Sequence, residues 1–280
     1  MLRRWLDAVA GYKVLVVGDG IVDEYAYVKP QGKSPKENLI TTRFLRLESF
    51  QGGVWAAAKH VEGFCAKVDV ATGTMSTVKR RYVEAEYHAK LYEVHSDRYE
   101  ESADEPQYAD YDLVIVTDFG HGFVSKSMIE DMTAQAQFLA VNAQTNSANF
   151  GYNLITKYPR ADYVVIDETE ARLAARDREG PIESVIRRLG FENIVVTLGP
   201  HGSVGYDGTF HRAPAISKDV VDTMGAGDAF FTVTAPLARA GAPMPVLLEV
   251  GNAAGAVKVG VLGHRRAVTR EALEAMLGQK

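Results

Sequence analysis

The sequence is poor in cysteine, in long apolar runs and in excess positive charge. Cys65 is the single cysteine among 280 residues, which excludes an internal disulfide or an all-cysteine metal site and is typical of a reducing compartment. No apolar run approaches the ~20 residues of a membrane-spanning helix, and the run at 14–17 is too short for a signal peptide. Lys and Arg total 31 against 36 Asp and Glu, a net charge of -5, which argues against nucleic-acid or membrane-surface binding. These absences predict a cytoplasmic protein with neither nucleic acid nor membrane as partner.

The phosphate-binding G-x-x-x-x-G-K-[ST] motif of P-loop kinases is also absent, as are internal repeats and low-complexity segments. Strand-like apolar runs alternate instead with helical patterns. Strands are expected at 13–17, 67–71, 112–116, 139–142, 161–166 and 192–198, with 67–71 and 112–116 central in the sheet. This alternation predicts a single α/β domain over residues 1–280, with a mostly parallel sheet and helices on both faces.

The most informative segment is Asp-Thr-Met-Gly-Ala-Gly-Asp at 222–228, followed by an apolar run to Leu237. Its two glycines allow a tight turn whose N–H groups can point at an anion, and the apolar run predicts a helix after it. Asp228 lies at the rim of this anion hole, where a carboxylate is unfavourable beside a phosphate unless it accepts a proton. A base beside an anion hole suits phosphoryl transfer to an alcohol. The alternative is a glycine-rich turn whose aspartate only caps a helix.

This segment resembles the D-T-x-G-A-G-D signature of the ribokinase, or PfkB-type, carbohydrate kinases. The resemblance implies a ribokinase-like fold with a small β lid, ATP and Mg2+ as cofactors, and a sugar or sugar phosphate as small-molecule partner. It assigns the catalytic base to Asp228, the anion hole to Gly225, Ala226 and Gly227, and a place beside the nucleotide to Thr223.

Acidic residues follow the first strand in Gly-Asp-x-x-x-Asp, residues 18–23. Open α/β sheets bind ligands at the carboxyl ends of their strands, where carboxylates can accept hydrogen bonds from sugar hydroxyls. The alternative is a solvated acidic turn. The motif resembles the start of the heptose-phosphate kinase branch of the PfkB family, which assigns Asp19 and Asp23 to the sugar site.

Two further turns resemble substrate-side motifs of that family. Gly52 and Gly53 match a glycine pair that begins a helix under the sugar, although Ala56 stands where many members have asparagine. The turn after 112–116 resembles the D-Y-x-K-G turn of the heptose-kinase branch, with His121 in place of lysine. Asp118 at that strand end is therefore a second candidate for the substrate site.

Two stretches of mixed strand-like pattern, about 24–50 and 80–98, resemble the lid that closes over the sugar in this family and often forms the dimer contact. The resemblance therefore implies a homodimer through the lid. Lys79 and Arg81 could bind a phosphate already present on the substrate. Equally, basic residues on exposed strands can simply discourage edge-to-edge aggregation.

Asp167 and Glu170 lie where a strand leads into a helix. Acidic residues in a first turn favour the helix dipole, so capping is one interpretation. The position also matches the N-x-x-E motif that organises magnesium and its waters in this family. Asp167 replaces the asparagine, which keeps an oxygen ligand and adds a negative charge suited to Mg2+.

The remaining nucleotide-side candidates also follow from the resemblance. Thr197, Gly199 and Gly202 match the V-T-x-G-x-x-G segment that lines the nucleotide. Asn252 lies in an alanine- and glycine-rich run that borders the adenine in the family.

Together these features predict an ATP-dependent sugar kinase. The closest resemblance is to the kinase domain of heptose-phosphate kinases of ADP-heptose synthesis, which implies D-glycero-D-manno-heptose 7-phosphate, phosphorylated at the anomeric hydroxyl. The sequence contains no H-x-G-H motif of a nucleotidyltransferase. The alternatives are a kinase for another sugar or a nucleoside, or a binding protein that keeps the fold without turnover.

Overall fold

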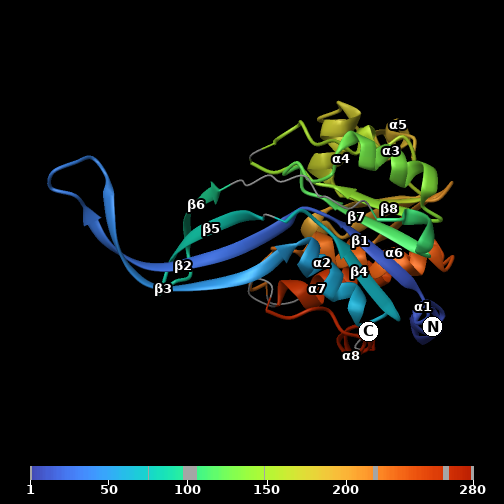
Figure 1. The fold of residues 1–280 in the computed structure, drawn as a ribbon, viewed down its shortest axis with the longest axis horizontal. Coiled ribbons are helices and arrows are strands. Elements are labelled where there is room, and N and C mark those ends of the chain that lie inside the picture. Colours follow the sequence, from blue (N-terminus) through green and yellow to red (C-terminus); the bar gives the residue numbers. More distant parts are fainter. Residues whose placement is uncertain are drawn as a thin grey trace.

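The computed structural model describes residues 2–74, 76–96, 106–147, 149–216, 220–260 and 265–278. Within these ranges the chain forms a sheet flanked by helices, and a second, smaller sheet extends away from one side of this body (Figure 1). No described helix is both long enough and apolar enough to cross a membrane. The predicted α/β class, with a mostly parallel main sheet and a small separate sheet, is confirmed.

The main sheet contains, in spatial order, β12 (Phe210–Ala213), β11 (Ser203–Tyr206), β10 (Ile194–Thr197), β9 (Tyr163–Asp167), β8 (Leu139–Ala143), β7 (Leu113–Asp118), β1 (Lys13–Gly18) and β4 (Lys67–Ala71). The strands from β10 to β4 run parallel, whereas β11 and β12 add an antiparallel edge. The sequence-based expectation placed β4 in the centre of the sheet, and this was wrong. The chain leaves β1 through the small sheet and a helix before it returns, so β4 pairs only with the outer side of β1.

Helices cover both faces of this sheet (Figure 1). One layer contains α1 (Leu2–Val9), α2 (Val54–Glu62), α6 (Ala226–Arg239), α7 (Met244–Val259) and α8 (Arg270–Leu277), and the other contains α3 (Lys126–Gln135), α4 (Glu168–Ala175) and α5 (Ile182–Leu189). Short 3-10 turns lie at Tyr108–Asp110, Ile155–Lys157 and Gly199–His201. Val14 and Val16 face the first layer, whereas Leu15 and Val17 face the second. Burial on both faces explains why the central strands are continuous apolar runs.

The chain leaves β1 and β7 toward opposite sides of the sheet. Gly18 at the end of β1 pairs with Thr117 near the end of β7. A crevice at the carboxyl ends of two such diverging strands is where open α/β sheets bind ligands. Asp19 and Asp118, which follow these positions, are therefore brought side by side.

The small sheet has the order β3 (Ile40–Gly53), β2 (Gly20–Lys33), β5 (Thr77–Glu84) and β6 (Lys90–Ser96). It includes most of the two expected lid stretches, and β2 and β3 reach further back, to the body. Residues 97 and 98 lie outside the described residues. Strand register places Asp23, Lys79 and His95 in one row, on the same face as Tyr25. Tyr25 packs with Met224 of the body, so this is the face turned toward residues 222–228, here called the anion loop.

Candidate active site

A cavity of about 660 Å³ opens at the carboxyl ends of β8, β9 and β10, beside the start of α6. Its walls bring together the residues predicted for catalysis, nucleotide and metal, namely Asp167, Glu170, Thr197, Gly199, Gly202, Thr223, Gly225, Ala226, Gly227, Asp228 and Asn252. The predicted substrate residues do not line this cavity. Asp19 and Asp118 lie at the ends of β1 and β7, Gly52 and Gly53 at the end of β3, and Asp23, Lys79 and Arg81 on the inner face of the small sheet.

The anion loop ends in the N-terminus of α6. Gly225 is the N-cap residue and has φ 73°, in the left-handed region that favours glycine. No described side chain caps this end of the helix, so its first backbone N–H groups remain for a ligand. Asp228 lies in the first turn of α6 and not at its N-cap. Helix capping therefore does not explain this aspartate.

Asp228 contacts a polar residue of the loop that follows β8. Gln144 Nε2 lies 2.5 Å from Asp228 Oδ1 and 2.8 Å from Asn142 Oδ1. Gln144 is not among the residues that the sequence analysis singles out. Its residue type carries no signal, because only the fold brings it to a residue 84 positions away.

Glu170 and Asp167 form a capping box at the start of α4. Glu170 N donates to Asp167 Oδ1 at 2.7 Å, and Asp167 N donates to Glu170 Oε2 at 2.8 Å. The second Glu170 oxygen accepts from Thr145 N at 3.0 Å. Burial, together with the charge of Asp167, raises the pKa of Glu170 to about 8. The two residues therefore do cap α4, as one interpretation of the sequence expected. Their carboxylates also lie close together in the wall of the cavity.

The residue types and the burial of this carboxylate pair suit a divalent cation. The charge of Asp167 raises the cost of ionising Glu170, and a cation held by these residues would lower that cost. Within the described ranges, no three His, Cys, Asp or Glu side chains gather as a metal site. Mg2+ is commonly held by one or two carboxylates together with waters and substrate phosphates, so the pair is compatible with a metal that arrives with a nucleotide.

Two lysines support the anion loop from outside the cavity. Lys258 of α7 is 1% exposed and donates to the Met224 carbonyl at 2.8 Å; burial lowers the pKa of its ammonium. Lys90 of β6 lies 3.2 Å from Asp222 Oδ1. The second contact joins the small sheet to the loop that precedes α6.

The inner face of the small sheet carries a cluster of charges. The Arg81 guanidinium lies 2.5 Å from Asp23 Oδ1 and 2.5 Å from Glu93 Oε2, so this arginine is already matched by two carboxylates. Lys79 is only 9% exposed and makes no hydrogen bond to any described residue. Burial lowers the pKa of Lys79, while the charges of Asp23 and Glu93 oppose that shift. A buried ammonium without a hydrogen-bond acceptor is costly unless a ligand supplies one.

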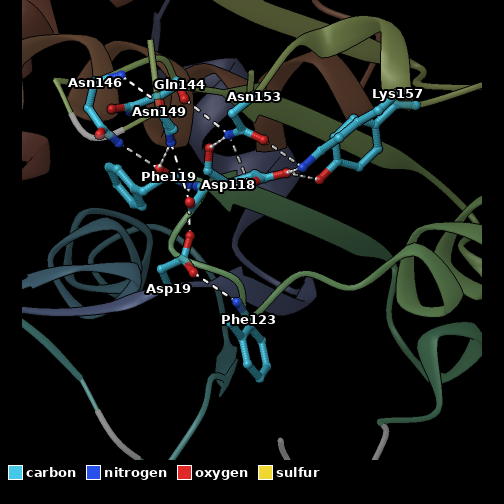
Figure 2. Close-up of polar contacts among 11 residues, drawn as sticks. Asp19, Asp118, Phe119, Phe123, Gln144, Asn146, Asn149, Asn153 and Lys157 are labelled. Carbon is cyan, nitrogen blue, oxygen red and sulfur yellow. Dashed lines mark hydrogen bonds and ion pairs between the residues drawn. The ribbon is translucent and has the colours of Figure 1, made fainter. Parts of the chain in front are cut away.

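Asp19 and Asp118 hold a loop (Figure 2), and neither is among the residues that line the cavity. The two oxygens of Asp19 accept from Phe119 N at 2.9 Å and Phe123 N at 3.1 Å. Asp118 Oδ2 accepts from Tyr158 Oη at 2.6 Å and lies 2.5 Å from Lys157 Nζ. The side chains are 3% and 1% exposed, and burial, then the charge of Asp118, raises the pKa of Asp19.

Three asparagines complete this network (Figure 2). Asn153 Nδ2 lies 2.9 Å from the Asp118 carbonyl and 3.0 Å from the Gln144 carbonyl. Asn146 and Asn149 both donate to the Phe119 carbonyl, at 2.7 and 2.8 Å. The network therefore ties the turn after β7 to the loop after β8, which carries Gln144. Neither Tyr158 nor the asparagines could be assigned this role from their spacing in the sequence.

The glycine pair Gly52 and Gly53, at the end of β3, lies beside Asp19. Val54 N donates to the Asp19 carbonyl at 3.1 Å. Gly53 has φ 57°, and an added Cβ would lie 2.4 Å from that carbonyl oxygen. Glycine is thus required where β3 runs into α2.

Comparisons with a family model and with individual proteins point to the same family. Residues 70–270 match the pfkB family carbohydrate kinase. A relative in Acidiphilium cryptum, "Bifunctional protein HldE", is 25% identical over 303 residues, covering 91% of this chain and 61% of that protein. The chain thus spans about three fifths of that relative's length.

Two solved structures share the fold. Ribokinase from Thermotoga maritima has a TM-score of 0.76 at 18% identity, covering 95% of this chain and 99% of that one. Arabidopsis thaliana ribokinase, complexed with ribose and ATP, has a TM-score of 0.70 at 16% identity, covering 95% and 99%. With a family match across most of its length and an anion loop beside Asp228, the chain belongs to the pfkB family of carbohydrate kinases.

Proposed function

We propose that this protein transfers the γ-phosphoryl group of ATP to a hydroxyl of a sugar or sugar phosphate. The observation that carries the proposal is the cavity at the uncapped N-terminus of α6, with Asp228 on its wall. Thr197, Gly199, Gly202, Thr223 and Asn252 line the same cavity, which supports their assignment to the nucleotide.

In this reaction Asp228 removes the proton from the acceptor hydroxyl as its oxygen attacks the γ-phosphorus. The bond from that phosphorus to the bridging oxygen breaks, and ADP leaves. Backbone N–H groups of Gly225, Ala226 and Gly227 stabilise the charge on the transferring group. Asp167 and Glu170 would hold Mg2+, which neutralises phosphate charge when bound.

The acceptor binds, in this proposal, between the carboxyl ends of β1 and β7 and the inner face of the small sheet. Asp23 accepts hydrogen bonds from the sugar, with Arg81 fixing its carboxylate, and Gly52 and Gly53 lie beside this site at the end of β3. Asp19 and Asp118 act indirectly, because their oxygens already accept from the loop and its neighbours. Closure of the small sheet would exclude water as a competing acceptor.

An anionic acceptor is favoured by Lys79. Its buried ammonium makes no hydrogen bond to any described residue, whereas Arg81 is matched by Asp23 and Glu93. A phosphate on the substrate would supply the acceptor atoms that Lys79 lacks. This supports a heptose phosphate, with D-glycero-D-manno-heptose 7-phosphate as the specific substrate, in line with the sequence resemblance and the HldE relatives.

We also propose a homodimer formed through the small sheet. Leu47, Tyr92 and Val94 lie on the face opposite Tyr25 and are 44%, 53% and 45% exposed. Contiguous exposed apolar side chains are typical of protein contact surfaces.

The test is Mg2+-dependent ADP release with neutral sugars, sugar phosphates including heptose 7-phosphate, carboxylate-bearing sugars and nucleosides. Turnover should be selective for an anionic sugar. Asp228→Asn should lower kcat by about 10²–10⁴, the usual contribution of a general base. Lys79→Met should raise KM for the anionic sugar at least tenfold and leave KM for ATP within about twofold.

The outcomes separate the alternatives. Turnover of a neutral sugar or nucleoside that is insensitive to Lys79→Met would overturn the anionic acceptor but retain the kinase. ATP binding without ADP release under any acceptor, and no effect of Asp228→Asn, would favour a binding protein that keeps the fold.

A further inference from the structure

The loop after β8 places one amide directly on the proposed base. Gln144 Nε2 lies 2.5 Å from Asp228 Oδ1 and 2.8 Å from Asn142 Oδ1. Asn142 Nδ2 in turn lies 2.7 Å from the Val165 carbonyl on β9. A chain of hydrogen bonds thus runs from the sheet to the first turn of α6.

The groups at the two ends of this series of hydrogen bonds determine which group donates at each step. The Val165 carbonyl can only accept, so Asn142 must present its NH₂ group there and its oxygen to Gln144. An ionised Asp228 can also only accept, so Gln144 must present its NH₂ group to both neighbours. One amide nitrogen has two hydrogens, and this arrangement uses both. Rotation of either amide would place acceptor against acceptor.

The backbone of Gln144 is held equally firmly. Its N–H donates to the Asp118 carbonyl at 2.8 Å, and its own carbonyl accepts from Asn153 at 3.0 Å. The network in Figure 2 therefore ends on the residue that touches the base. The next residue, Thr145, donates its N–H to Glu170. Consecutive residues of one loop thus contact two carboxylates that line the cavity, Asp228 and Glu170.

The charges around Asp228 make this contact important. Asp167 on β9 brings negative charge to the same cavity, Glu170 on α4 adds to it when it is ionised, and no Lys or Arg is among the described lining residues. Lys258 of α7 brings the compensating positive charge from beneath the loop. A hydrogen bond donated to a carboxylate favours its ionised form and restricts its rotamer.

We propose that Gln144 is a positioning residue for Asp228, which holds the carboxylate ionised and in one orientation through its side-chain NH₂ group. The proposal rests on the proposed function, in which Asp228 is the base. It predicts that loss of the amide impairs the chemical step and leaves nucleotide binding largely intact.

The variants are Gln144→Leu, which removes the amide at similar size, and Gln144→Glu, which places a second carboxylate against Asp228. Gln137→Leu is the matched control, because Gln137 donates only to the Ala109 carbonyl on the exposed surface. Gln144→Leu should lower kcat about 10- to 100-fold, as expected for a lost hydrogen bond to a charged group, with KM for ATP within about threefold. The acidic limb of the pH profile of kcat should shift to higher pH by about one unit in Gln144→Leu, and by more in Gln144→Glu.

A second readout does not require turnover. The carboxyl ¹³C resonance of Asp228, assigned with Asp228→Asn, should titrate at higher pH in Gln144→Leu than in the wild-type protein. An unchanged titration in a folded variant would overturn the proposal even if the kinase is active. A shifted titration in a protein that turns over no acceptor would retain the contact and overturn the kinase. A loss confined to KM for ATP would make Gln144 a nucleotide contact only.

Discussion

Buried ionisable groups in this molecule have different roles according to what surrounds them. Asp19 and Asp118 are fully engaged by the loops after β7 and β8. Glu170 retains a pKa of about 8 because burial and Asp167 both oppose its charge. Lys79 is a buried cation that makes no hydrogen bond to a described residue. A ligand of opposite charge would stabilise the ionised form of Glu170 and of Lys79.

Cys65 gives a prediction about pH at the scale of one residue. It lies just beyond α2 against the helical core, and burial raises the pKa of its thiol to about 12, with a smaller effect from Asp112. Since the thiolate is the reactive form, alkylation by iodoacetamide at pH 8 should be about a thousandfold slower in the native than in the unfolded protein.

The sign for stability follows from the same shift. The unfolded thiol loses its proton first as pH rises above about 8.5, so native stability should fall between that pH and about 12. Cys65→Ser should abolish labelling altogether and remove this component of the pH dependence. Rapid native labelling with unchanged thermal stability would contradict a buried neutral thiol.

At the scale of elements, the contact between α6 and α7 shapes the cavity. Gly251 and Gly255 lie on α7, and both line the cavity. An added Cβ at Gly251 would lie 2.4 Å from the ring of Phe230 on α6, whereas at Gly255 its nearest neighbour would be 3.7 Å away. Glycine is therefore needed at the first position for packing and not at the second.

Replacement of each glycine by alanine tests this difference within one helix. Both changes gain about 0.8–1 kcal/mol of helix propensity. Gly255→Ala should keep that gain, whereas Gly251→Ala must displace a buried ring and should lower the free energy of unfolding by about 1–3 kcal/mol. Urea unfolding measures both, and nucleotide titration should show weaker binding only for Gly251→Ala. Equal stabilisation of the two variants would mean that Phe230 yields without cost.

At the scale of the whole molecule, the small sheet extends away from the body (Figure 1), and the face that carries Tyr25 contacts Met224 of the body, which leaves the opposite face outward. On the outward face, Tyr82 and Tyr92 stack with ring centroids 4.5 Å apart, and Leu47 lies in the same row. This row would form the centre of the proposed dimer contact.

Sedimentation velocity should therefore show a dimer. Tyr92→Lys and Leu47→Lys should each raise its dissociation constant at least tenfold, because a charge at the centre of an apolar contact is left desolvated and unpaired. Val70→Lys is the control, since Val70 is 38% exposed on β4 of the main sheet. A wild-type monomer at high micromolar concentration, or equal effects of all three changes, would reject this surface.

The sequence by itself determined the features that depend on neighbouring residues. The apolar runs predicted β1, β7, β8, β9 and β10 to within a few residues, because burial on both faces leaves a local pattern. Gly225 and the helix after it followed from the conformational freedom of glycine and the apolar run to Leu237. A threonine just before a helical pattern is a local signal of the same kind, and Thr269 is the N-cap of α8, where its side chain accepts from Ala272 N. The residues proposed to contact the nucleotide were chosen from the family resemblance, and they line one cavity.

Only the tertiary structure decided what each polar side chain contacts. Asp19 and Asp23 occupy one sequence motif, yet the oxygens of Asp19 accept N–H groups about 100 residues away, whereas Asp23 pairs with Arg81 of another strand. The place of β4 at the edge and the hydrogen bond from Gln144 to Asp228 likewise depend on how distant segments meet. A carboxylate or amide at a strand end has the same local pattern whether it binds a ligand, a backbone N–H or water. The choice is made by which groups the fold brings within about 3 Å.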